Sequence, residues 1–172
     1  RATRKVAEQI AEKSITLVKD ELSIVPVDVS KYKKIACITL RDTRAKLTDK
    51  NKTTFEKLIE KQVDKINVGR LSRKSTDKEY DKMLKLASNS DLILLPTYVN
   101  VRSFQGSVDI DQRHSEFIQK LAALKKPLVV LSFGNPYIIN KFNEVPAYLT
   151  SYGSVYYSQK AMVDALLGYT EI

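Results

Sequence analysis

Few residues in this chain have the types and spacings that enzyme chemistry requires. The sequence holds one histidine, His114, and one cysteine, Cys37. A Ser-His-Asp triad would have to use His114, but this residue stands four positions before Ile118 at the start of a helical pattern. It borders the buried face of that helix, so we interpret it as a structural or surface residue. Cys37 lies within an apolar run and is interpreted as a small core residue, and a lone cysteine builds neither an internal disulfide nor a cysteine zinc site.

Aspartates at the ends of expected strands are the next candidates. Asp42 follows the first central strand, where phosphoacceptor or metal-binding carboxylates often lie, but the preceding Leu40 and Arg41 add no acidic partner. Asp109 and Asp111 precede a helix and are interpreted as helix caps. No strand is followed by the glycines of a dinucleotide site, by a Walker loop or by a nucleophile elbow. We therefore predict no metal site and no cofactor.

The most unusual polar segment covers residues 98–107. It carries a guanidinium at Arg102, a hydroxyl at Ser103, an amide at Gln105 and a glycine at Gly106. The segment is long for a connection from a strand to a helix, and it follows the carboxyl end of a central strand. Its polar groups suit recognition of a ligand or of a neighbouring domain. The alternative is that the segment only seals the edge of the sheet.

Short apolar runs that alternate with longer amphipathic stretches position these residues. Apolar residues at helical spacing and the capping boxes Thr53/Glu56 and Thr76/Glu79 predict helices, the last at 158–167 with Gly168 after it. Strands are predicted at 15–18, 35–40, 91–95 and 128–131, with a weaker signal at 65–71 and an edge strand at 145–152.

This alternation predicts one doubly wound α/β domain over residues 1–172. Its sheet is mostly parallel, with about five strands and with helices on both faces, as in a flavodoxin-like three-layer sandwich. Ligands in such sheets gather beyond the carboxyl ends of the strands, which here are 40–44, 96–106 and 132–137.

The charge of the chain at first suggests a polyanion partner. The 172 residues include 29 Lys and Arg against 20 Asp and Glu, a formal net charge of +9. On the predicted helices, however, the lysines are interleaved with acidic residues, which is typical of solvated faces with i,i+4 pairing. We therefore predict no nucleic-acid partner. No apolar run approaches the length of a membrane span, and without an initiator methionine the chain is expected to be a piece of a longer protein.

Several motifs spread over nearly the whole chain carry a family resemblance. The most specific is Ser-Phe-Gly-Asn-Pro-Tyr at 132–137, and residues 11–20, 91–95, 119–127, 145–149 and 159–168 extend it. Together they resemble the C-terminal domain of glycoside hydrolase family 3, and most of all its β-N-acetylhexosaminidase branch. That domain normally continues a little beyond Ile172.

The resemblance implies that catalysis belongs to another part of the polypeptide. In that family a preceding (β/α)8 barrel carries the nucleophilic aspartate, and the reaction is retaining, through a glycosyl-enzyme intermediate. Glucosidase members place the acid/base glutamate in the loop that here reads Arg-Ser-Phe-Gln-Gly-Ser-Val-Asp at 102–109 and holds no glutamate. Hexosaminidase members use a His–Asp pair on a barrel loop instead. No catalytic residue is therefore expected in this chain.

The sequence thus favours a non-catalytic C-terminal domain that packs on the barrel of a β-N-acetylhexosaminidase-like hydrolase acting on N-acetylglucosaminides. Arg102, Ser103, Gln105 and, on the adjacent loop, Asn135 are the expected residues of the sugar-site rim or of the domain interface, and the isolated chain is expected to be inactive. The alternatives are a free-standing flavodoxin-like domain that binds a phosphorylated small molecule, and a non-enzymatic interaction module. The sequence does not encode the localisation, which is unknown at this point. The resemblance implies a bacterial enzyme that is either cytoplasmic or exported, with a periplasmic or exported location favoured.

Overall fold

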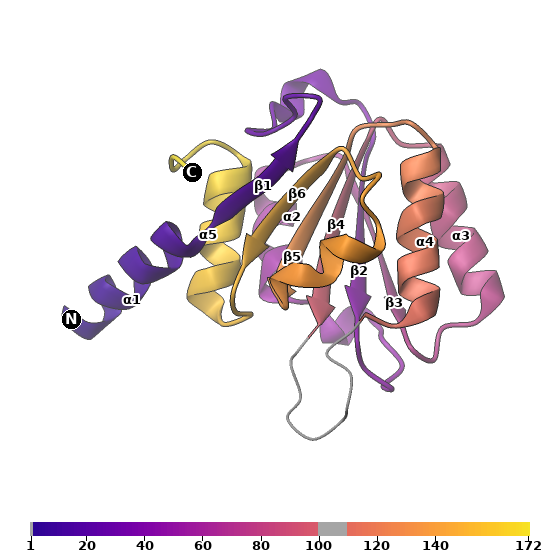
Figure 1. The fold of residues 1–172 in the computed structure, drawn as a ribbon, viewed down its shortest axis with the longest axis horizontal. Helices are drawn as coiled ribbons and strands as arrows, with labels where there is room; N and C mark the ends of the chain where they lie inside the picture. Colours follow the sequence, from indigo (N-terminus) through magenta and orange to yellow (C-terminus); the bar gives the residue numbers. More distant parts are fainter. Residues whose placement is uncertain (1, 100–109) are drawn as a thin grey trace.

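The computed structural model describes residues 2–99 and 110–172, which form a three-layer α/β sandwich (Figure 1). The central sheet has the strand order β1-β6-β5-β4-β2-β3. Strands β2 to β6 run parallel to one another, and β1 pairs with β6 in the antiparallel direction. The strands are β1 (Thr16–Asp20), β2 (Ile35–Arg41), β3 (Ile66–Ser72), β4 (Leu92–Val99), β5 (Leu128–Gly134) and β6 (Ala147–Ser151).

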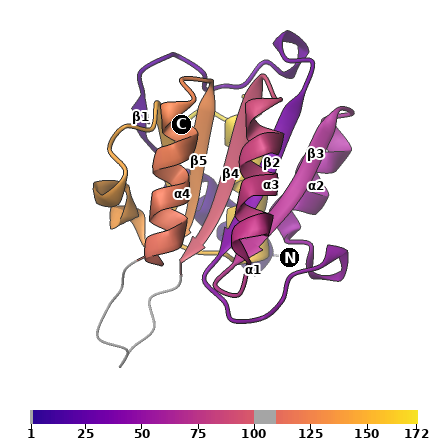
Figure 2. The same cartoon turned by 90° about the vertical axis from the view of Figure 1, so that its right-hand side faces the viewer.

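Helices cover both faces of the sheet because the central strands β2, β4, β5 and β6 bury side chains on both sides. On one face α2 and α5 pack against a core that includes Phe55, Phe133 and Met162. On the other face lie α3 and α4 (Figure 2). They pack against a second core that includes Ile93 and Leu121. The helices are α1 (Ala2–Ser14), which packs on α5, and α2 (Thr54–Gln62), α3 (Asp77–Ser88), α4 (Gln112–Ala123) and α5 (Tyr156–Leu166).

The predicted fold class is confirmed, with six strands in the place of about five. The prediction that 145–152 forms an edge strand is wrong. All five residues of β6 are buried, because β1 continues the sheet beyond it. The edge strand on this side of the sheet is β1, whose residues are exposed or half-buried, and β3 forms the opposite edge. The sequence does not indicate this arrangement, since the short run at the start of the chain pairs with a segment more than a hundred residues away.

The helix ends follow the predicted caps, with one informative exception. Thr76 and Glu79 form a reciprocal capping box at α3, and Asp111 caps α4 by accepting from the Arg113 amide. At α2, Thr53 accepts from the Glu56 amide as predicted. The Glu56 carboxylate, however, does not return to the backbone of Thr53 but turns into the protein interior. None of the helices in the described part of the chain is long and apolar enough to cross a membrane.

Candidate functional site

A polar pocket of about 390 Å³ opens at the carboxyl ends of β2 and β4. The start of α2 and the β6–α5 connection form its other walls. Its volume falls within the usual range of small-ligand sites. The doubly wound topology predicts that ligands bind at this edge of the sheet. The segment 40–44, which is predicted on that basis, contributes residues to the pocket. The lining residues are Arg41, Asp42, Thr43, Asn51, Lys52, Thr53, Thr54, Tyr98, Ser154 and Gln159.

Tyr98 joins the pocket to the core below it. Its ring stacks on Phe133 with centroids 4.7 Å apart, and Phe133 in turn packs against Phe55 at the start of α2. The Tyr98 hydroxyl donates to Oε1 of Gln159 over 2.8 Å. Burial raises the pKa of Tyr98 well above its ordinary value, so this hydroxyl keeps its proton at neutral pH.

Gln159 holds three segments together at the pocket wall. Its Oε1 accepts from the Tyr98 hydroxyl and from the Phe55 amide, the latter over 2.9 Å, and its Nε2 donates to the Ser154 carbonyl over 2.6 Å. The side chain is almost completely buried. One amide thus joins β4, the first turn of α2 and the β6–α5 connection. It also engages one of the helix amides that would otherwise face the pocket.

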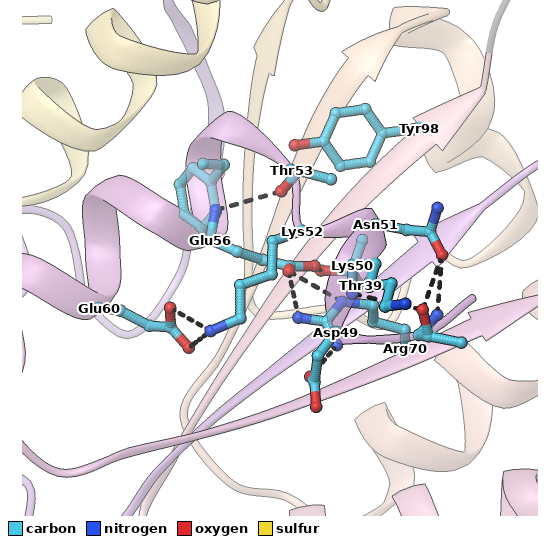
Figure 3. Close-up of polar contacts among 12 residues, drawn as sticks. Thr39, Asp49, Lys50, Asn51, Lys52, Thr53, Glu56, Glu60, Arg70 and Tyr98 are labelled. Atoms are coloured by element: carbon cyan, nitrogen blue, oxygen red, sulfur yellow. Dashed lines mark hydrogen bonds and ion pairs between the residues drawn. The ribbon is translucent and has the colours of Figure 1, made fainter.

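A buried charge cluster fixes the outer wall (Figure 3). The Glu56 carboxylate is fully buried and accepts from Thr39 Oγ1 over 2.6 Å. Its other oxygen accepts from Nε and Nη2 of Arg70 over 2.9 and 2.6 Å. Arg70 also donates to Asp49 over 2.8 Å, at the short 3-10 helix Asp49–Asn51. The cluster therefore ties α2, β2, β3 and the β2–α2 connection into one unit beside the pocket.

Two of the charged residues in the pocket wall already have partners. Lys52 donates to both carboxylate oxygens of Glu60 over 2.8 Å. Asp42 forms an ion pair with Arg73. Asp42 thus serves as an ion-pair partner in this structure, and among the described residues no other acidic side chain lines the pocket. Of the charged lining residues, these pairings leave Arg41 without an ion-pair partner among the described residues.

Three of the four residues predicted for the rim, Arg102, Ser103 and Gln105, lie outside the described residues, and so does Asp109. Their role stays a prediction. Asn135 is almost completely buried and caps the 3-10 helix Pro136–Lys141, accepting from the Tyr137 amide over 3.0 Å. It does not line the polar pocket. Its observed role is local, and a part in the rim stays a prediction.

The structural interpretations of His114 and Cys37 are confirmed. His114 is buried, its Nδ1 lies 2.7 Å from the Tyr80 hydroxyl, and burial lowers its pKa. Cys37 is buried in β2, and burial raises its pKa, which keeps the thiol protonated and unreactive. Within residues 2–99 and 110–172, no group of three metal-ligating side chains comes together.

The sequence predicts Glu56 only as a helix-capping residue and gives no sign that Arg70 and Gln159 also build the walls of the pocket. It places Arg41 beside Asp42, in the strand end 40–44, without a role of its own. The alternation of side chains between the two faces of β2 could have indicated part of this arrangement. In a strand whose apolar residues are buried on both faces, Cys37, Thr39 and Arg41 must share one face, and a polar residue there needs a partner from the helix above.

No family model matches the sequence, and no curated protein matches it. Solved structures, however, match this chain in fold. A glycoside hydrolase family 3 β-N-acetylglucosaminidase from Paenibacillus sp. covers 98% of this chain with a TM-score of 0.77 and 20% identity, and the match spans 31% of that enzyme.

Two further solved structures match this chain over a similar share of its length and with similar TM-scores, and the first of them is also a family 3 enzyme. A fungal multi-domain β-N-acetylglucosaminidase covers 99% of this chain at 17% identity with a TM-score of 0.77, over 18% of its own length. A β-glucosidase from Listeria innocua covers 98% of this chain at 14% identity with a TM-score of 0.75, over 25% of its own length. The chain thus has the fold of one part of these enzymes, and it spans less than a third of their length. The two β-N-acetylglucosaminidases belong to the family that the sequence motifs resemble.

Proposed function

We propose that this chain is the non-catalytic C-terminal domain of a retaining, β-N-acetylhexosaminidase-like glycoside hydrolase of family 3. In this proposal it packs on a catalytic (β/α)8 barrel of the same polypeptide and borders the sugar site. One observation carries the proposal: a fold match over 98% of this chain accounts for only 31% of a family 3 β-N-acetylglucosaminidase. The sequence motifs point independently to the same family.

A surface suited to a partner domain lies beside the pocket. Val6 and Ile10 on α1, with Tyr152, Val155 and Tyr156 around the start of α5, are more than half exposed; we term these five residues the α1–α5 patch. The two elements are neighbours, since α1 packs on α5. Exposed apolar residues concentrated on adjacent elements are typical of interaction surfaces. The barrel is the occupant we propose, because the similar enzymes carry more than twice this chain's length outside the matched part.

Val155 supports this use of the patch. It occupies the N-cap position of α5 and makes no side-chain hydrogen bond to the helix. Valine is among the poorest N-cap residues, whereas Ser, Thr, Asp and Asn stabilise a helix start. A large apolar side chain at an exposed cap position weakens the isolated domain. Burial under a partner would recover that loss through the hydrophobic effect.

Specificity for N-acetylglucosaminides is part of the proposal and rests on the loop sequence. Among the similar structures are both β-N-acetylglucosaminidases and β-glucosidases. The sequence at 100–109 has no glutamate, and Gln105 cannot act as a proton donor because an amide does not titrate in the useful range. This favours the branch in which the acid/base group belongs to the barrel.

The test compares the full-length polypeptide with the 172-residue chain. The full-length protein should hydrolyse an aryl N-acetyl-β-glucosaminide in preference to the aryl β-glucoside, and the 172-residue chain should hydrolyse neither. Turnover by the chain alone would overturn the non-catalytic assignment. A preference of the full-length protein for the glucoside would overturn the proposed specificity, and an upstream sequence without a barrel would favour the interaction module.

The packing proposal has its own variant, Val155→Asp. Aspartate is a good N-cap, so the substitution should stabilise the isolated chain by about 0.5–1 kcal/mol. In the full-length protein it should instead bury a charge at the interface, separate the unfolding of the two domains and expose the linker to protease. Leu22→Asp is the control, since Leu22 is 58% exposed but lies outside the patch. Equal effects of the two variants on the full-length protein would contradict docking through the patch.

A further inference from the structure

The polar pocket contains a guanidinium that no described residue neutralises. Arg41 is half-buried at the end of β2, and among the described residues its guanidinium has no hydrogen-bond or ion-pair partner. The register pairs Arg41 with Tyr98, which places both side chains on the α2–α5 face of the sheet. Arg41 is close enough to Tyr98 to lower the pKa of that hydroxyl, against the larger effect of burial.

The described lining of the pocket does not balance the charge of Arg41. Lys52 is held by Glu60, which is not a lining residue, and Asp42 is held by Arg73. With Arg41 and Lys52 against Asp42, the lining carries a formal excess of one positive charge. A guanidinium recognises a carboxylate or phosphate through two parallel hydrogen bonds, which gives both affinity and direction.

Neutral donors surround this cation. The hydroxyls of Thr54 and Ser154 and the amide nitrogen of Asn51 line the pocket, and none of them has a partner within the protein's described hydrogen bonds. By contrast, the first-turn amides of Phe55 and Glu56 at α2 already donate to Gln159 and Thr53. An anion here must therefore be held mainly by side chains and not by the helix start.

We propose that this pocket binds a monosaccharide that carries one anionic group. The anionic group, a carboxylate or a phosphate, pairs with Arg41, and the sugar hydroxyls accept from Asn51, Thr54 and Ser154. A volume of about 390 Å³ accommodates a sugar ring with its anionic substituent. The site belongs to this domain alone. It requires neither residues 100–109 nor a catalytic barrel, so it stands or falls independently of the proposed hydrolase function.

The ligand is identified by titrating the isotopically labelled 172-residue chain and following its backbone amide signals by NMR. The probes are glucuronate, glucose 6-phosphate and glucose, at constant ionic strength. Binding of either anionic sugar, with signal shifts at Thr54 and Ser154 and at least tenfold weaker binding of glucose, is the expected result; which anionic sugar binds more tightly distinguishes carboxylate from phosphate. Equal binding of glucose, or no binding of any probe, overturns the proposal.

Matched variants assign the binding to Arg41. Arg41→Gln should weaken binding of the anionic sugar about tenfold or more, the effect of losing a charged hydrogen-bond pair. Arg44→Gln removes the same charge from the same connection, but Arg44 is exposed and does not line the pocket, so its effect should be less than about twofold. Thermal unfolding establishes that both variants are folded. Equal losses in the two variants would show a general charge effect and overturn the assignment.

Discussion

Replacing Glu56 with glutamine tests the structural basis of the pocket wall. Glu56 is fully buried and accepts hydrogen bonds from Thr39 and, twice, from Arg70, whose side chain is 7% exposed. Breaking one side of a buried ion pair costs about 3–5 kcal/mol, because the other charge stays buried without compensation. Arg70 keeps Asp49, whose side chain is 91% exposed, and a glutamine oxygen still accepts one bond. We therefore expect the lower end of that range, about 3 kcal/mol.

The measurement is urea-induced unfolding of the 172-residue chain, followed by circular dichroism. In a thermal unfolding experiment the same loss of about 3 kcal/mol would lower the Tm by about 6–12 °C for a domain of this size. The control is Glu60→Gln, which removes the partner of Lys52. These two side chains are 30% and 31% exposed, so the expected cost is below about 1 kcal/mol.

A third variant separates the cost of an unpaired charge from the value of the pair. Glu56→Met combined with Arg70→Met replaces both charges with apolar side chains of similar length. Such replacements are often close to neutral, so the double variant should be more stable than Glu56→Gln. If Glu56→Gln is no less stable than Glu60→Gln, the buried cluster does not hold the pocket wall and the reasoning is refuted.

Two further substitutions test packing and protonation. Burial lowers the pKa of His114 below its ordinary 6.5, so the unfolded chain binds a proton that the folded chain does not, and stability should fall as the pH drops below about 6.5. His114→Asn should therefore lose less stability than the native chain between about pH 7.5 and about pH 5.5, measured by urea unfolding; an identical loss would contradict the assignment. A Cβ at Gly69 would lie 2.1 Å from Met83 Sδ, so Gly69→Ala should cost about 1–3 kcal/mol, reduced to the extent that the methionine moves. Gly153→Ala, whose Cβ would lie 3.5 Å from Ser158 Oγ, should cost under about 0.5 kcal/mol by thermal unfolding, and equal costs would count against the packing argument.

Local signals in the sequence were sufficient to predict the main helices and strands and the fold class. Thr76 and Glu79 predict the start of α3 because both partners of the capping box lie within one helical turn. Gly168 follows α5 with a φ of 77°, the left-handed conformation that glycine favours at a helix end. The alternation of strands and helices then leaves few arrangements besides a parallel sheet with helices on both faces.

The candidate site was less accessible from the sequence. The segment 40–44 was predicted from topology alone, and the structure places it at the pocket. Gln159 was not predicted, because a glutamine in the last helix carries no local sign that it binds a tyrosine and a helix amide from distant segments. The resemblance to a known family directed attention to residues 102–105, which lie outside the described residues.

The sequence by itself determined where helices and strands form, how they are capped and which faces are buried. The tertiary structure alone decided that β1 pairs antiparallel with β6 at one edge of the sheet and that Glu56 leaves its capping box for Arg70. It also decided that Arg41 lines a pocket as a cation with no partner among the described residues. The physical reason is the separation along the sequence over which each interaction acts. Periodicity and capping act over a few residues, whereas strand order and the partners of buried charges depend on segments that meet only when the chain has folded.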